Sequence, residues 1–105
     1  MTDEERRLKL HEELVSILGS RNVYFQPPES VKLKYPCIIY TRKRPDTIRA
    51  NNKIYRNVPR YQVTFITKDP EDKRSGEILY HFLWISENDE GVTDNLYHHY
   101  FDLYY

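Results

Sequence analysis

Apolar and polar residues alternate with a helical period along the first part of the chain. Thr2 followed by Glu5 has the form of a capping box, and Gly19 is well placed to end a helix. The pattern therefore predicts an amphipathic helix over about residues 3–18. Its apolar stripe consists of Leu8, Leu14, Val15 and Leu18, flanked by Leu10 and Ile17.

Three later runs are typical of strands, because apolar, β-branched and aromatic residues are concentrated in them. The run at residues 23–26 is short and is followed by two prolines, which favours an edge strand. Residues 37–41 are apolar on both alternating faces, as in a central strand. Residues 61–67 alternate, with Tyr61, Val63 and Phe65 on one face.

The two longer strands are expected to pair as one hairpin. If residues 50–53 form the turn, residue 37 faces residue 66. On this register Pro45 interrupts the ladder, together with a second proline on the facing strand, because proline has no N–H to donate. We therefore expect a base within the sheet and an outer arm over about residues 44–59, which is long for a surface connection.

The second half of the chain predicts one more helix and one more strand. Asp69 followed by Pro70 is typical of a helix start, and the helix is expected over about residues 70–85. Residues 86–91 are read as an acidic turn, and the alternating residues 95–105 as a last strand. The apolar stripe of this helix is expected to contain Ile78, Leu79, Phe82 and Leu83, with Trp84 at its border.

Together these elements predict an α+β fold: a mostly antiparallel sheet of about four strands with two helices packed on it, in the order α-β-β-β-α-β. The 105 residues fit a single domain over 1–105 with one core. The single cysteine excludes an internal disulfide and favours a reducing compartment. Neither a membrane-spanning run nor a secretory signal is recognisable, so we expect an intracellular protein.

The net charge of zero hides a strong asymmetry along the chain. Residues 42–68 carry eight bases and one acid, whereas residues 69–105 carry nine acids and two bases. The two blocks either attract each other within one molecule or bring the basic block of one subunit against the acidic block of a neighbour. Contacts of the second kind close into rings or continue as filaments.

Candidate catalytic groups are weak in this sequence. Cys37 lies in an apolar strand, where a buried thiol is expected rather than a nucleophile. His98 and His99 are adjacent on a predicted strand, so their side chains point to opposite faces and cannot share a metal ion. Acids at residues 69–72 are explained by the start of a helix. The residues therefore predict no enzymatic activity, no metal site and no cofactor.

The basic arm is the best candidate for a binding surface. Cations with nearby tyrosines can contact a neighbouring subunit, and they can also contact nucleic acid, although nucleic-acid-binding domains are usually basic overall. The candidate oligomer or partner interface consists of Arg42, Lys43, Arg44, Arg49, Lys53, Tyr55, Arg56 and Arg60.

Several short motifs occur in an order that resembles the tail terminator (tail completion) proteins of long-tailed bacteriophages. Their order along the chain is Tyr35-Pro36-Cys37-Ile38-Ile39-Tyr40, Ala50-Asn51-Asn52-Lys53-Ile54-Tyr55, Arg60-Tyr61-Gln62-Val63-Thr64-Phe65-Ile66, Asp69-Pro70 and Asp94-Asn95-Leu96-Tyr97-His98. The resemblance implies a small α+β subunit of a hexameric ring in the virion, at the head-proximal end of the tail tube.

The same resemblance implies what such a ring would do and bind. It would stop tube polymerisation and join the tail to the head, with the tube protein and a neck connector as partners. The genomic DNA would pass through it without sequence-specific binding, and no membrane, catalysis or cofactor would be involved. Two alternatives stay open: another neck component, such as a head-completion or stopper ring, and a nucleic-acid-binding module that uses the basic arm.

Overall fold

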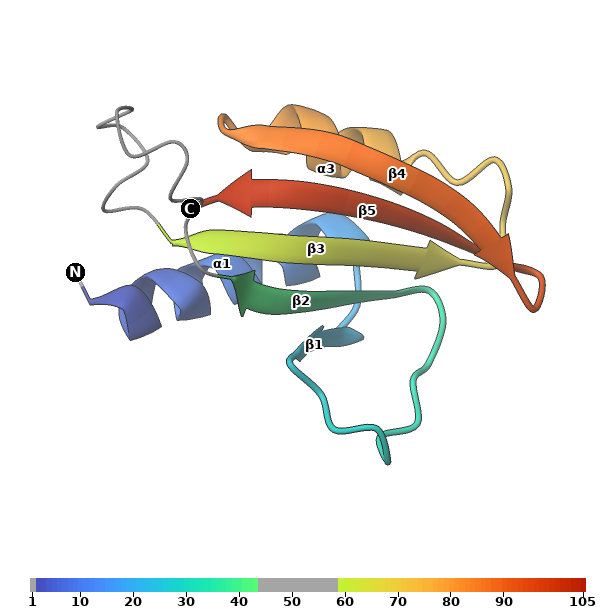
Figure 1. The fold of residues 1–105 in the computed structure, drawn as a ribbon, viewed down its shortest axis with the longest axis horizontal. Helices are drawn as coiled ribbons and strands as arrows, with labels where there is room; N and C mark the ends of the chain where they lie inside the picture. Colours follow the sequence, from blue (N-terminus) through green and yellow to red (C-terminus); the bar gives the residue numbers. More distant parts are fainter. Residues whose placement is uncertain (1, 44–58) are drawn as a thin grey trace.

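The computed structural model describes residues 2–43 and 59–105 as a five-stranded sheet with two helices (Figure 1). In chain order the elements are α1 (Asp3–Leu18), β1 (Val23–Phe25), β2 (Cys37–Lys43), β3 (Arg60–Thr67), α3 (Arg74–His81), β4 (Ile85–Thr93) and β5 (Leu96–Tyr104). The strand order across the sheet is β1-β2-β3-β5-β4. Only β1 and β2 run parallel, and the other neighbours are antiparallel. The α+β class is confirmed, with one strand more than the sequence predicts.

The first helix forms as its sequence predicts. The Thr2 hydroxyl accepts a hydrogen bond from the backbone N–H of Glu5 at 3.1 Å, and the Glu5 side chain accepts one from the backbone of Thr2. Gly19 ends the helix in the left-handed region, with φ of 80°, and its N–H donates to the Val15 carbonyl. Glycine suits this position because a side chain would be strained there.

The pairing of β2 with β3 also confirms the predicted register. Cys37 lies opposite Ile66, and Thr41 lies opposite Gln62. The base of the hairpin therefore belongs to the sheet, whereas the expected outer arm lies outside the described residues, apart from Pro59.

The prediction for the second helix was wrong at both ends. The Asp69–Asp72 segment is a turn, in which the Asp69 carboxylate accepts from the Glu71 N–H at 2.9 Å, and α3 starts only at Arg74. The helix ends at His81, because the next residues extend toward β4. The predicted stripe is therefore split: Ile78 and Phe82 are buried, but Leu83 is exposed.

The acidic turn predicted at residues 86–91 is instead part of β4, a nine-residue strand. The turn lies later, at Asp94 and Asn95, which have φ of 52° and 62° and connect β4 directly to β5. Two consecutive residues with positive φ are typical of a type I′ hairpin turn, and Asp and Asn tolerate this conformation better than most residues. The last strand itself is confirmed.

The core lies between the two helices and one face of the sheet. Alternation on β3 and β5 directs Tyr61, Val63 and Phe65, together with Phe101 and Leu103, toward the helices. The helices contribute Leu10, Leu14, Leu18 and Ile78, and Phe82 packs against them directly after α3. Figure 1 views the opposite face of the sheet, which no described helix covers.

Candidate interface between subunits

The described part of the predicted basic interface lies at one end of β2 and β3. Arg42 and Lys43 are the last residues of β2, and Arg60 begins β3 directly opposite Lys43. Figure 1 shows this end of β2 beside the start of β3. The remaining predicted interface residues, Arg44, Arg49, Lys53, Tyr55 and Arg56, lie outside the described residues.

Two of these cations are engaged within the chain. The Arg42 guanidinium donates to the Tyr61 hydroxyl at 2.9 Å and to the Asp3 carbonyl at 3.3 Å, and it lies over the Tyr61 ring. Arg60 forms an ion pair with Asp102 of β5 at 3.2 Å. The Arg60–Asp102 pair joins the basic and acidic blocks of the sequence inside one molecule. Lys43 is exposed, as is Arg42.

The acidic block has a long run of exposed residues on β4. This strand lies at the edge of the sheet, and all its residues after Ile85 are exposed. Glu87, Asp89 and Glu90 give it three negative charges within four positions. Among the described strands only β5 pairs with β4, so its outer edge offers backbone N–H and C=O groups to another chain. We call residues 85–93 the acidic edge.

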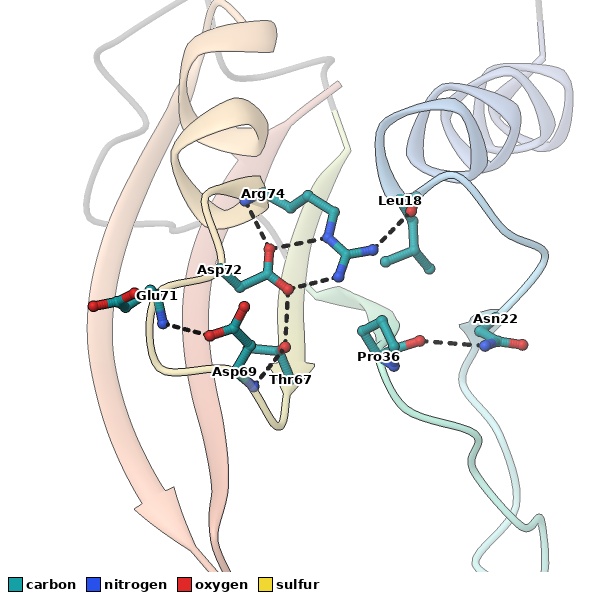
Figure 2. Close-up of polar contacts among 8 residues, drawn as sticks. All are labelled: Leu18, Asn22, Pro36, Thr67, Asp69, Glu71, Asp72 and Arg74. Carbon is teal, nitrogen blue, oxygen red and sulfur yellow. Dashed lines mark hydrogen bonds and ion pairs between the residues drawn. The ribbon is translucent and has the colours of Figure 1, made fainter.

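Of the carboxylates expected at a helix start, Asp72 is bound to Arg74 instead. Figure 2 shows the Asp72 carboxylate accepting from the Arg74 guanidinium, at 2.9 Å from Nε and 2.6 Å from Nη2, and from the Thr67 hydroxyl at 2.9 Å. Nη1 of Arg74 donates to the Leu18 carbonyl at 3.0 Å, at the end of α1. The hydrogen bonds from Arg74, and then the one from Thr67, hold the pKa of Asp72 down at about 2, so the carboxylate is ionised at neutral pH.

A surface pocket of about 350 Å³ lies where α1, the α3–β4 connection and the end of β5 meet. Its acidic group is Glu13, which accepts hydrogen bonds from Tyr105 Oη and, at 2.9 Å, from His81 Nε2. Burial alone would raise the pKa of Glu13, but these two bonds outweigh it and lower the pKa. No described serine, threonine or cysteine lines the pocket, and the hydroxyl beside the Glu13 carboxylate is that of Tyr105.

The other titratable candidates occupy structural positions. Cys37 is fully buried, and burial raises the pKa of its thiol to about 11, which disfavours the reactive thiolate. His11 Nδ1 lies 2.7 Å from the Tyr40 hydroxyl, and burial lowers its pKa. His98 stacks on Tyr100, whereas its neighbour His99 stacks on Phe65, as expected for adjacent residues of a strand.

His99 nevertheless has carboxylate neighbours that the sequence analysis missed. Its Nδ1 lies 3.1 Å from Glu87 Oε2 and 3.9 Å from Glu90 Oε2, both on β4. Reading residues 86–91 as a turn separated these acids from the histidine. The available signal was the Asp94-Asn95 pair between Val92 and Leu96, which marks a tight hairpin.

Comparisons of the chain with models of protein families, with curated proteins and with solved structures found no match. The candidate interface therefore rests on this chain's own geometry. Within residues 2–43 and 59–105, neither helix has the length and apolar character needed to cross a bilayer.

Proposed function

We propose that this chain is a structural subunit of a ring at the head-proximal end of a phage tail tube, where it ends tube polymerisation and joins the tail to the head. In this proposal the chain works by binding alone, with no catalytic step and no cofactor. Its partners are further copies of itself in a hexamer, the tube protein and a neck connector. DNA passes through the ring without being read.

The observation that carries the proposal is the acidic edge. A long exposed edge strand pairs readily with another strand, and natural proteins control this with charge. If two copies of β4 paired with each other, their acids would lie close together, and like charges opposite each other destabilise a sheet. The acidic edge is therefore suited to a basic segment of a different surface and unsuited to a symmetric contact with itself.

The basic segment that fits this edge begins at the far end of β2. Lys43 is exposed there, and the sequence continues with Arg44, Arg49, Lys53 and Arg56. A contact between two different surfaces of identical subunits is heterologous, and it produces a closed ring if the rotation closes. The order of sequence motifs that resembles tail terminators supports a ring over an open filament.

Charge reversal on each surface tests this contact. In the first variant Glu87, Asp89 and Glu90 are replaced by Lys, and in the second Lys43, Arg44, Arg49 and Arg56 are replaced by Glu. Arg42 and Arg60 are left unchanged, because both make contacts within the subunit. Each variant alone should stay folded and monomeric under conditions where the unchanged chain forms rings, as measured by native mass spectrometry and electron microscopy.

The decisive measurement is made on pairs of variants. Because the two surfaces are different, a chain that carries both reversals should regain the ring. The basic side chains would then lie on β4 and the acidic ones on the segment after β2. Failure of the double variant to assemble, while each single variant stays folded, would contradict a contact between these two surfaces. Absence of any ring of the unchanged chain, with or without tail tubes, would contradict the proposed function itself.

The same preparation separates the two alternatives. A ring that binds the portal-side adaptor and not the tube would make the chain another neck component. Tight binding of the monomer to duplex DNA, weakening by roughly 0.9 log unit per phosphate contact for each log unit of added salt, would favour a nucleic-acid-binding module.

A further inference from the structure

Glu87, Glu90 and His99 bring two carboxylates and one imidazole together where β4 pairs with β5. We propose that these three residues, here called the β4–β5 triad, bind one divalent transition-metal cation such as Zn²⁺. Glu87 and Glu90 also belong to the acidic edge, but metal binding would be a property of one subunit, so a monomer is sufficient to test it whether or not a ring forms.

An irregularity in β4 creates the triad. Residues three apart on a regular strand point to opposite faces of the sheet, so Glu87 and Glu90 would be separated. The pairing of β4 with β5 shifts between Glu87, opposite Phe101, and Asp89, opposite Tyr100. The extra residue at this bulge turns both glutamates to the face that carries His99.

The distances are close to those of a coordination sphere. His99 Nδ1 lies 3.1 Å from Glu87 Oε2 and 3.9 Å from Glu90 Oε2, and the three donor atoms all lie within 4.8 Å of one another. Ligand atoms about 2.1 Å from a tetrahedral ion are about 3.4 Å apart, so small side-chain rotations are sufficient. Glu90 can make this adjustment, because 76% of its side chain is exposed.

His99 is the ordered ligand of the triad. Its ring stacks on Phe65, with ring centroids 6.1 Å apart and 25° between the planes, and only 19% of its side chain is exposed. A ring held in this way presents Nδ1 to the two carboxylates at little further cost in conformational entropy.

The charge of the triad also favours a cation. Among the described residues, His99 is the only basic side chain within 4.0 Å of the Glu87 and Glu90 carboxylates. A divalent ion would neutralise both acids. The imidazole nitrogen selects a transition metal over Mg²⁺ or Ca²⁺, which prefer oxygen ligands throughout. Since the site is open to solvent, water would complete the coordination.

Bound metal would fasten the edge strand to the sheet. The ion would connect both sides of the bulge in β4 to His99 of β5, so it should stabilise the least covered strand of the fold. A ligand that binds only the folded state raises the stability of that state in proportion to the logarithm of its concentration over Kd.

The experiment is a calorimetric titration of the full, chelator-treated monomer with Zn²⁺ and, separately, with Mg²⁺ at neutral pH. We expect one Zn²⁺ per chain and no comparable binding of Mg²⁺. Glu90→Gln should weaken Zn²⁺ binding by at least about tenfold, because even outer contacts of metal sites are worth that much. His99→Gln should weaken it as strongly, and Co²⁺ titrations should lose their ligand-field bands in both variants.

Asp89→Asn is the matched control. It removes one negative charge beside Glu90, and it keeps the Oδ1 atom that accepts the Glu90 N–H at 2.8 Å. Asp89 and Glu90 are adjacent on the strand, so their side chains point to opposite faces and Asp89 lies away from the triad. The Zn²⁺ affinity of the variant should therefore stay within about twofold of that of the unchanged chain.

Three results would overturn the inference. The first is no Zn²⁺ binding at millimolar concentration. The second is equal weakening by Asp89→Asn and Glu90→Gln, which would indicate general attraction by negative charge. The third is undiminished binding in Glu90→Gln, which would place the ion elsewhere; because Glu90 is exposed, loss of folding does not complicate this variant.

Discussion

Arg74 holds the Asp72 carboxylate with two guanidinium nitrogens, at 2.9 and 2.6 Å, and the same guanidinium donates to the last carbonyl of α1. One side chain therefore connects the loop after β3, the start of α3 and the end of α1 (Figure 2). The Asp72 side chain is only 6% exposed, so this ion pair is shielded from water on one side.

Replacement of Arg74 should destabilise the fold strongly. Arg74→Ala leaves a nearly buried carboxylate without its partner, and we expect a loss of about 2–4 kcal/mol in the free energy of unfolding. Arg74→Lys should recover only part of this loss, because an ammonium cannot make the two parallel bonds. Urea denaturation measures both, with the exposed Lys73→Ala as control. A loss below about 0.5 kcal/mol in Arg74→Ala would contradict this role.

The Asp72 carboxylate should also control stability in acid. Its pKa is about 2 in the folded chain, below its ordinary 3.8, so the unfolded state binds the proton more readily. The stabilisation is complete well above pH 3.8 and is lost as the pH falls through about 2. It amounts to about 2 kcal/mol. Asp72→Asn should have lower stability at neutral pH but a flatter decline between these limits, measured by urea denaturation across the acid range.

His11 should make stability depend on pH in a higher window. Burial lowers its pKa below 6.5, so the unfolded chain takes up the proton first and stability falls as the pH drops below 6.5. His11→Gln keeps a side-chain acceptor for the Tyr40 hydroxyl but has no group that titrates in this pH range. The fall in stability below pH 6.5 should therefore disappear in this variant. Identical pH dependence in both proteins, measured between about pH 7.5 and 5.5, would contradict the assignment.

Phe82 and Leu83 distinguish the observed end of α3 from the predicted helix, whose apolar stripe contains both residues. Phe82 is buried and meets the rings of His81 and Tyr105 edge-on, so Phe82→Ala should cost about 3–5 kcal/mol. Leu83 is 87% exposed, and Leu83→Ala should change stability by less than about 0.5 kcal/mol. A helix continued to residue 85 would bury both residues, and similar losses in the two variants would restore that prediction.

The sequence by itself determined the elements whose signals are local. The first helix follows from its capping box, its apolar spacing and Gly19, because these act within a few residues. The pairing of Cys37 with Ile66 was predicted by placing the hairpin turn at residues 50–53, because Gly, Asn and Asp are typical turn residues and the turn sets the register of the strands it connects.

Only the tertiary structure decided the second half of the sheet. The acidic edge has charged residues on both faces and no apolar alternation, so its extended conformation comes from hydrogen bonds to β5 and not from its own composition. The α3 helix starts past the Asp69-Pro70 signal, at Arg74, whose bond to the Leu18 carbonyl joins segments far apart in sequence. Contacts of this kind have no local pattern, and the β4–β5 triad, built across two strands at a bulge, depends on them entirely.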